Sequence, residues 1–431
     1  MESSDREMKG WQLPFFSIWT GQAFSLVGSR LVQFALVWWL TETTGSATVL
    51  AMATLVAILP GVILGPFAGT LVDRWNRRIV MIVADGVVAL VTAWLAYLLW
   101  TGSATMWHVY AAMLARALGG AFHWPAMQAS TSLMVPKKHL SRVAGLNQTM
   151  QGALSIVAPP LGALLLSLLP LQGIMAIDLV TAVLAIVPLL FVVIPQPEKV
   201  AGAAQKGSVW SDFRTGLRYV AGWPGLMIIL VMAMLINFVV NPAFSLMPLL
   251  VTDHFGGGAL QLGWLQSAWG VGMLAGGLLL SVWGGFRRRI YTSLMGLIVA
   301  GVAIMVLGLV PGNVFWLALV ALLVAGFMNP LINGPLFAIL QATVEPGMQG
   351  RVFTLVQSLS AAMMPLSLMV AGPVSDAIGV QTWYLFGGAT FALMGILALF
   401  VPAAIKLEDG RPEVEESQSA PEAVDVALAG E

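Results

Sequence analysis

Long apolar runs separated by short polar segments extend along almost the whole sequence. Each run has 20 or more residues without alternation of apolar and polar positions, which favours helices over the strands of a membrane barrel. About 20 apolar residues suffice for a helix to cross the hydrocarbon core of a bilayer. The pattern therefore predicts twelve membrane-spanning helices, at residues 13–40, 46–72, 79–101, 104–131, 143–167, 171–194, 223–252, 259–283, 290–310, 313–341, 352–376 and 380–404.

The composition excludes an ordinary soluble enzyme. Hydrophobic residues make up 58% and charged residues 9% of the 431 residues, against roughly 45–50% and about 25% in soluble domains. With no Cys and only four His, disulfides and thiolate metal sites are excluded, and we expect neither a metal nor a cofactor. No phosphate loop or Ser-His-Asp spacing stands out, so an enzyme is the least favoured class. Without a phosphate loop the chain would not hydrolyse ATP by that chemistry, and any transport would depend on an ion gradient or run downhill.

Basic residues are sorted between the two sides of the predicted membrane protein. Eighteen of the 20 Lys and Arg lie in the two terminal segments and in alternate loops, whereas the other loops hold only Glu42, Asp253 and Asp376. The positive-inside rule then places both termini in the cytoplasm. The two basic residues outside this sorting, Arg30 and Arg116, lie within spans.

A polar stretch divides the chain into two halves. Trp210, Phe213, Leu217 and Val220 recur within it at helical spacing, which predicts an amphipathic helix on the cytoplasmic membrane face; a calmodulin-like partner site is the alternative. The predicted segments are a cytoplasmic tail at 1–12, a six-helix bundle at 13–195, a linker at 196–222, a second six-helix bundle at 223–404 and an acidic disordered tail at 405–431.

The two halves repeat each other. Residues 135–148 align without gaps with residues 344–357, pairing Arg142 with Arg351, and residues 77–79 align with residues 288–290. Two six-helix bundles in the same orientation are typical of transporters built from parallel repeats. The predicted fold is therefore an all-α membrane protein of twelve helices in two pseudo-symmetric bundles.

The end of the second span carries a family signature. The segment from Gly65 to Arg78 resembles the loop motif G-x-L-a-D-R-x-G-R-R of the major facilitator superfamily, with Asn76 at the family's loop glycine. Asn is among the few residues enriched at positive φ, so we expect the turn to be kept. Gly65 and Gly69 would let another helix approach closely, Asp73 would brace helix ends, and the basic residues would meet anionic headgroups. A generic positively charged loop is the alternative. The conformational motif comprises Gly65, Gly69, Asp73, Arg74, Arg77 and Arg78.

Two further spans resemble motifs of the same family. Arg116, followed by Gly119, Gly120 and His123, is similar to the fourth-helix motif with its buried arginine. A charge at membrane depth is a functional candidate, although Arg116 could instead pair with a carboxylate to hold helices together. Residues 158–162 match the family's antiporter motif G-P-x-x-G only in part, and a packing bend explains them equally well.

Polar residues within the membrane gather in the first and fourth helix of each half. In the superfamily fold, the resemblance implies that these four helices line the central cavity. Amides that pack helices together, worth about 0.6 kcal/mol each, are the alternative. The candidate cavity and coupling residues are Arg30, Gln33, Arg116, His123, Asn237, Asn241, Asn329 and Asn333, with Gln22 and Ser29 beside Arg30.

The only acids well inside spans are Asp85 and Asp178. They are the candidate proton carriers, but the resemblance places their helices at the periphery of each half. Structural pairing is therefore the favoured interpretation, with Asp85 expected beside the cytoplasmic arginines.

The segment from Trp38 to Ser46, together with the second-span motif and Val135-Pro136, resembles the macrolide-efflux branch of the superfamily over residues 13–404. The resemblance implies proton-driven export of amphipathic drugs across a bacterial inner membrane, with a small amphipathic molecule, protons and the bilayer as partners, no nucleic acid, and a monomeric protein. An exporter of anionic metabolites such as siderophores is one alternative, because Arg30, Arg116 and His123 would make the cavity electropositive. A transporter-like sensor or assembly partner that moves nothing is another.

Overall fold

The computed structural model describes residues 10–72, 74–196 and 209–410, and these residues form helices and short connections without a strand. The first half contains α2 (Gln12–Thr44), α3 (Ala47–Val72), α4 (Arg77–Trp100), α5 (Met106–Met134), α6 (Leu140–Leu168) and α7 (Leu171–Phe191). The second half contains α9 (Pro224–Ser245), α11 (Ala259–Trp283), α12 (Arg289–Leu309), α13 (Phe315–Thr343), α14 (Pro346–Ile378) and α15 (Val380–Leu399). Shorter elements are η1 (Lys137–His139), α8 (Val209–Ala221), α10 (Met247–Leu249), the π-helical turn η2 (Leu250–His254), α16 (Pro402–Ile405) and η3 (Lys406–Asp409).

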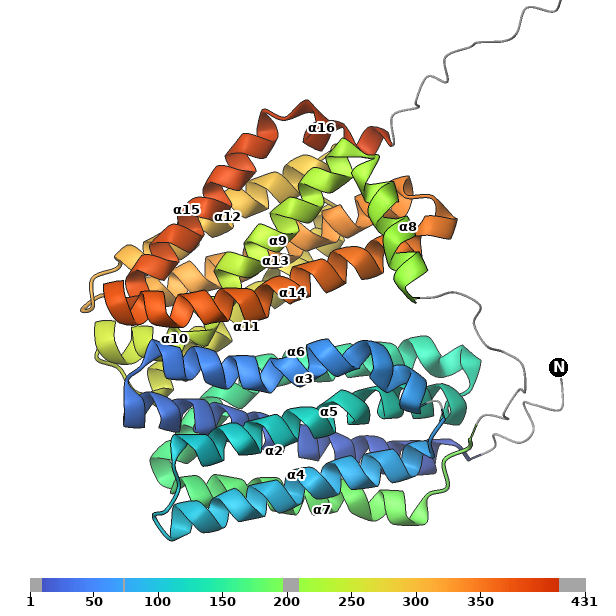
Figure 1. Cartoon of the computed structure of the whole chain (residues 1–431), viewed down its shortest axis with the longest axis vertical. Coiled ribbons are helices and arrows are strands. Elements are labelled where there is room, and N and C mark those ends of the chain that lie inside the picture. Colours follow the sequence, from blue (N-terminus) through green and yellow to red (C-terminus); the bar gives the residue numbers. More distant parts are fainter. Residues whose placement is uncertain (1–9, 73, 197–208, 411–431) are drawn as a thin grey trace, which may run out of the picture.

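The predicted all-helical membrane fold is confirmed. Among the described helices, eleven are long and apolar enough to cross a membrane. The remaining long helix, α5, has the length of a span but a lower hydropathy, because it carries Arg116, His123 and several other polar residues. The two sets of six helices form two bundles that lie side by side (Figure 1), with α3 packed against α14 and α6 against α11 where they meet.

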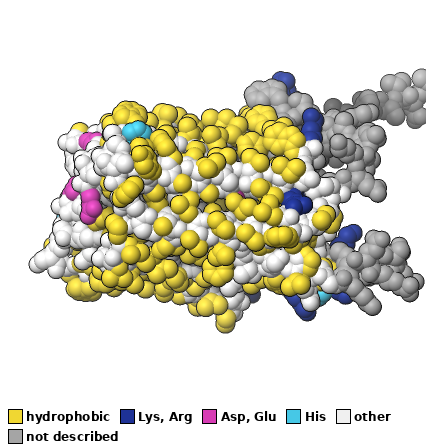
Figure 2. All heavy atoms as spheres, turned by 90° about the horizontal axis from the view of Figure 1, so that it is seen from below, with side chains coloured by type: hydrophobic (Ala, Val, Ile, Leu, Met, Phe, Trp, Pro, Cys, Tyr) yellow, Lys and Arg dark blue, Asp and Glu magenta, His cyan; other side chains and the backbone are white. Residues whose placement is uncertain are grey.

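The two ends of the molecule carry side chains of opposite charge. Figure 2 shows a flank covered by hydrophobic side chains, with acidic residues near one end and basic residues near the other. We call the end with the α3–α4 connection and Arg351 the basic end, and the end with Glu42, Asp253 and Asp376 the acidic end. Both described chain ends lie at the basic end, since Trp11 stacks on His139 and Asp409 lies 3.8 Å from Arg288.

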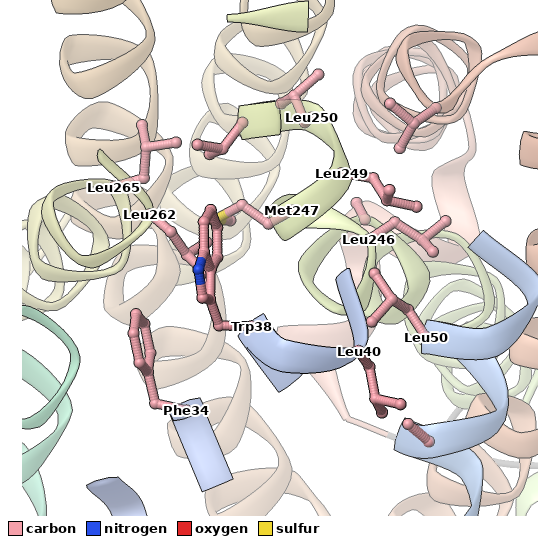
Figure 3. Packing of buried hydrophobic residues seen from close by; sticks show 14 of the residues in the cluster. Phe34, Trp38, Leu40, Leu50, Leu246, Met247, Leu249, Leu250, Leu262 and Leu265 are labelled. Atoms are coloured by element: carbon pink, nitrogen blue, oxygen red, sulfur yellow. The ribbon is translucent and has the colours of Figure 1, made fainter. Parts of the chain in front are cut away.

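The two halves meet closely at the acidic end. Figure 3 shows Trp38 of α2 beside Met247 of α10, and both belong to a buried apolar cluster that takes residues from both halves. Nearby, Gly263 of α11 lies against the backbone of Pro159 and Pro160 in α6, where a Cβ would come within 3.0 Å. Small residues at such crossings let membrane helices pack backbone to backbone.

The halves are apart at the basic end. Within the described part of the chain, a Cβ added at Gly61, Gly65 or Gly69 of α3 would have no neighbour within 4 Å, and the same holds at Gly145 of α6 and Gly347 of α14. Figure 1 shows the bundles diverging in this direction, from α10 toward α8. The structure is therefore closed at the acidic end and open at the basic end.

The predicted linker helix is present as α8 and packs on the second half. Val220 and Tyr219 are buried, whereas Leu217 is exposed and the side chain of Trp210 lies outside the described residues. Gly216 faces α14, where a Cβ would lie 3.3 Å from the carbonyl oxygen of Arg351, so the absence of a side chain lets the two helices approach. Contact of the apolar face of α8 with the membrane stays a prediction.

The predicted start of the disordered tail, at residue 405, is too early, because the ordered structure continues to Asp409. Residues 402–409 form α16 and η3, Leu407 is fully buried, and the Glu408 carboxylate accepts the N–H of Ile290 at 2.7 Å. Glu408 thus caps the first turn of α12, where unpaired N–H groups favour an acid. Residues 411–431 lie outside the described part of the chain.

Candidate functional site

The loop motif at the basic end binds its own half. Asn76 has φ −69° and accepts hydrogen bonds from the N–H groups of Arg78 and Ile79, so it caps α4 instead of adopting the positive φ expected for the family's loop glycine. Capping by an Asn side chain satisfies N–H groups that a helix start leaves unpaired.

Two of the three motif arginines bind backbone carbonyl oxygens of the protein, whereas all three were predicted to meet lipid headgroups. Arg77 is buried and donates from Nη1 to the carbonyl oxygen of Ala129 at 3.0 Å. Arg78 donates to the carbonyl oxygens of Leu189 and Leu190. Leu189 and Leu190 belong to the last turn of α7, where unpaired oxygens and the helix dipole favour a cation. Only Arg74 is exposed, and Asp73 lies outside the described residues.

The motif glycines do not support a helix contact here. Among the described residues, nothing lies within 4 Å of a Cβ added at Gly65 or Gly69, so none of the described helices makes the predicted close approach in this conformation. The cause is the separation of the two halves at the basic end.

A cavity of about 470 Å³ lies within the first half and is called the N-cavity. Its polar lining comes from α2, α4, α5 and α6, and it holds all four candidate residues predicted from this half. The polar lining residues are Gln22, Ser25, Ser29, Arg30, Gln33, Asp85, Arg116, His123, Gln128 and Asn147.

Arg116 belongs to a buried network of hydrogen bonds and one ion pair behind the N-cavity. Its Nη1 lies 2.7 Å from Oδ2 of Asp178 in α7, and it also donates to the hydroxyl of Thr92 in α4. Thr92 donates to Oδ2 of Asp178 at 3.1 Å, and Ser29 of α2 donates to Oδ1 at 3.3 Å. The Asp178 side chain is only 2% exposed. Four helices therefore converge on one carboxylate, which fits the predicted structural pairing of Asp178.

Glycine permits this convergence. A Cβ at Gly28 of α2 would overlap the hydroxyl of Thr181 and lie 3.0 Å from the Cα of Asp178. Gly28 thus lets α2 approach α7 closely enough for Ser29 to reach the carboxylate.

Asp85 does not pair with the basic-end arginines, which corrects the prediction. Its Oδ2 accepts the amide of Gln22 at 2.8 Å, and its Oδ1 lies 3.4 Å from Nε2 of His123. Arg77 and Arg78 instead bind carbonyl oxygens of α5 and α7. Although α4 was expected at the periphery, its Asp85 carboxylate lines the N-cavity.

Arg30 presents its charge to open space. Its side chain is exposed and forms no hydrogen bond or ion pair within the described part of the chain. It lines the N-cavity, a neighbouring cavity beside α6, and a cavity of about 310 Å³ between the halves. Gln33 and Ala158 line the cavity between the halves as well.

The second half contains its own cavity of about 330 Å³, the C-cavity. It is lined mainly by apolar side chains and by the four predicted asparagines, Asn237, Asn241, Asn329 and Asn333. Asn237 donates to the Ala233 carbonyl at 2.9 Å, and Asn333 donates to the Asn329 carbonyl at 3.0 Å. Much of their hydrogen-bonding capacity is therefore used within their own helices.

Several residues at the site were not predicted, among them Thr92, Phe244 and Trp269. Thr92 lies seven positions after Asp85, two turns along the same face of α4, and this spacing could have revealed it. Phe244 and Trp269 form an edge-to-face pair with ring centroids 4.6 Å apart, and both line the C-cavity and the cavity between the halves. Nothing distinguishes these two rings from other aromatic residues in the sequence. Within the described residues, no group of three or more His, Asp or Glu could hold a metal.

Known proteins resemble this chain over most of its length. It is 34% identical to "Macrolide efflux protein A" of Streptococcus pyogenes over 398 residues, covering 92% of this chain and 98% of the relative. It is 28% identical to "Multidrug efflux pump Tap" of Mycolicibacterium fortuitum over 395 residues, covering 88% and 94% of the two chains.

Solved structures share the fold. The nucleoside transporter NupG superposes with a TM-score of 0.68 at 14% identity, covering 91% of this chain and all of NupG. A bacterial homologue of the human lysosomal transporter Spinster, solved in an inward-facing and unoccupied conformation, has the same TM-score and identity, covering 93% and 98% of the two chains. The sequence profile of the Major Facilitator Superfamily matches residues 18–368. The chain is therefore a multi-pass membrane protein that belongs to the Major Facilitator Superfamily, a family of transporters.

Proposed function

We propose that the protein exports amphipathic drugs, macrolides among them, across the bacterial inner membrane in exchange for protons. The observation that carries this proposal is the pair of cavities, one in each half, whose walls combine apolar surface with a few polar groups. Sites of this composition suit amphipathic ligands, because apolar area supplies affinity and sparse polar groups set orientation. Similarity to Macrolide efflux protein A over 92% of the chain supports macrolides as the substrate class.

The transport cycle is a rocking of residues 13–195 against residues 223–404. In the structure the halves touch at the acidic end and separate at the basic end. The sorting of Lys and Arg supports a cytoplasmic basic end, so this conformer would receive substrate from the cytoplasm. The protein works as a monomer, since each half contributes one cavity and the two face each other within one chain.

The test is uptake of radiolabelled erythromycin into inverted membrane vesicles from cells that express the protein. We expect uptake when the vesicles are energised and its loss on addition of an uncoupler. Uptake equal to that of vesicles lacking the protein would contradict drug export, and uptake that resists the uncoupler would contradict proton coupling.

Export of an anionic metabolite is the second candidate, and Arg30 favours it. An unpaired guanidinium that borders three cavities can bind a carboxylate in a bidentate geometry. If the natural substrate is an anion, Arg30→Gln should abolish its export while erythromycin uptake remains. Equal losses for both compounds would remove this preference for anions.

A further inference from the structure

The two buried carboxylates of the first half differ in how completely they are paired. Asp178 accepts hydrogen bonds from Ser29 and Thr92, and its Oδ2 lies 2.7 Å from the Arg116 guanidinium. Both oxygens of this carboxylate therefore have hydrogen-bond donors, and the adjacent guanidinium supplies the opposite charge. Asp178 also lies outside the lining of the N-cavity, so it lacks both an unpaired oxygen and a path for a proton.

Asp85 is paired only in part. Gln22 donates to Oδ2, but the contact between Oδ1 and Nε2 of His123, at 3.4 Å, does not meet hydrogen-bond geometry. Nε2 of His123 is itself buried and has no hydrogen-bond partner. Buried polar atoms of this kind are rare and call for an explanation. A small rotation of either side chain would close the contact, so the pair can be coupled or uncoupled without rearranging the helices.

The packing of α4 against α5 brings these two side chains together. A Cβ at Gly119 would lie 3.0 Å from Val88 and 3.4 Å from the carbonyl oxygen of Ala84. Gly119 lies one helical turn before His123, and Ala84 precedes Asp85. The missing side chain at Gly119 therefore sets the distance between the carboxylate and the imidazole.

Both side chains lie nearer to the basic end of their helices than to the acidic end. Asp85 and His123 line the N-cavity with Gln22. At 1.5 Å per residue, Asp85 lies about 12 Å along α4 from Arg77, and His123 lies about 16 Å along α5 from Met134. Both depths are counted from the end at which the two halves are apart.

The charged groups around the pair are few. Arg30 of α2 and Arg116 of α5 line the same cavity, and Asp178 of α7 lies behind Arg116. The described lining residues of the C-cavity include no ionisable side chain. Arg116 and Asp178 pair with each other, and an arginine stays protonated in proteins. Asp85 and His123 therefore remain as the cavity groups that can gain or lose a proton.

We propose that Asp85 and His123 form the site that binds and releases the coupling proton, and that Asp178 with Arg116 is a structural pair. This proposal rests on the proposed proton-coupled export. Uptake of one proton neutralises the Asp85 carboxylate or charges the His123 ring. Release of the proton to water in the N-cavity restores the Asp85 carboxylate, which accepts a hydrogen bond from the Gln22 amide. Gln22 is therefore a positioning residue.

The transport test compares Asp85→Asn and His123→Gln with Glu42→Gln, an acid-to-amide control at the acidic end. In the first assay, a pH gradient is imposed across proteoliposomes and the accumulation of radiolabelled erythromycin is measured. In the second, exchange of labelled for unlabelled erythromycin is measured without a gradient. We expect the inside-to-outside ratio to fall to one for D85N and H123Q while exchange remains measurable, and no change in either quantity for E42Q. Retained accumulation in D85N or H123Q, or loss of exchange along with accumulation, would overturn the proposal.

A second measurement needs no substrate. Dicyclohexylcarbodiimide reacts with protonated carboxyl groups in apolar surroundings, and the modified peptide is identified by mass spectrometry. We expect modification at Asp85 that decreases as the pH of the reaction rises, and none at Asp178. Modification at Asp178, or absence of modification at Asp85, would overturn the assignment. If the wild-type protein moves no erythromycin but Asp85 is modified as expected, the drug proposal fails and the proton site stands.

Discussion

Asp376 of α14 caps the first turn of α3 by binding Thr48 across the boundary between the two halves. Its Oδ2 accepts the Thr48 N–H at 3.0 Å and the Thr48 hydroxyl at 2.6 Å, and its Oδ1 accepts the Ala47 N–H at 2.6 Å. Ser46 adds a hydroxyl bond to Oδ2 at 3.1 Å. A helix start leaves N–H groups unpaired and favours negative charge. The cap exists only while the acidic end is closed, so it stabilises this conformation specifically.

Asp376→Ala should shift the protein toward conformations open at the acidic end. Loss of an Asp cap costs about 1 kcal/mol, with a range of roughly 0.5–2, and one to two kcal/mol changes an equilibrium constant roughly 5- to 30-fold. Because the chain has no Cys, spin labels at Ser103→Cys and Asn313→Cys, both exposed at this end, report the separation of the halves. We expect a larger fraction of long distances.

Asp253→Asn is the matched control for that measurement. Asp253 lines the same small cavity as Asp376, but its carboxylate is bonded to the neighbouring Thr252. Its distance distribution should match that of the parent protein. An unchanged distribution in Asp376→Ala would show that the apolar contacts around Trp38 hold the acidic end closed without the cap.

The structure also shows where sequence reasoning succeeds and where it stops. Arg116 and Asp178 could be singled out because charges at membrane depth are costly and rare. Their pairing could not be predicted, since it depends on which helices are neighbours and how each is rotated. The family resemblance placed the helix of Asp85 at the periphery, yet close packing at Gly119 turns its carboxylate toward the N-cavity.

The loop motif illustrates a second limit. Gly65 and Gly69 have the spacing of a helix contact, but contact between halves depends on the conformational state, which a sequence does not specify. Asn76 illustrates a third limit: Asn suits both a positive φ and a helix cap, so the residue type alone does not decide between the two conformations. The start of α4 immediately after it decides between them.

Arg116→Ala should destabilise the folded protein, and neutralising Asp178 should reverse much of the loss. Removing one member of a buried ion pair leaves an uncompensated charge and costs about 3–5 kcal/mol, whereas replacing both members is often nearly neutral. The measurement is the fraction of detergent-solubilised protein that stays monodisperse after heating. We expect a lower midpoint temperature for R116A and partial recovery for the double variant R116A/D178N. A double variant no more stable than R116A would contradict the structural pairing.

Gly28→Ala should weaken the packing of α2 on α7. The new methyl group would overlap the Thr181 hydroxyl and lie 2.9 Å from Oδ1 of Asp178, and overpacking of this kind costs about 1–3 kcal/mol. Gly61→Ala in α3 is the control, because nothing lies within 4 Å of its added Cβ. In the same heating assay, G28A should have a lower midpoint than G61A. Equal midpoints would mean that α2 can move away from α7 at little cost.

Asn329→Ala should weaken drug binding more than Asn237→Ala. Both side chains line the C-cavity, but the Asn237 amide is engaged at both ends, donating to the Ala233 carbonyl and accepting from Asn241. Within the described chain the Asn329 side chain forms no hydrogen bond, so both ends of its amide can bind substrate. One hydrogen bond is worth about 0.5–1.5 kcal/mol, which corresponds to a rise in the KM for erythromycin of roughly 2- to 10-fold. Initial uptake rates in energised inverted vesicles measure this KM, and a larger rise in Asn237→Ala than in Asn329→Ala would show that free amide groups do not identify the residues that bind substrate.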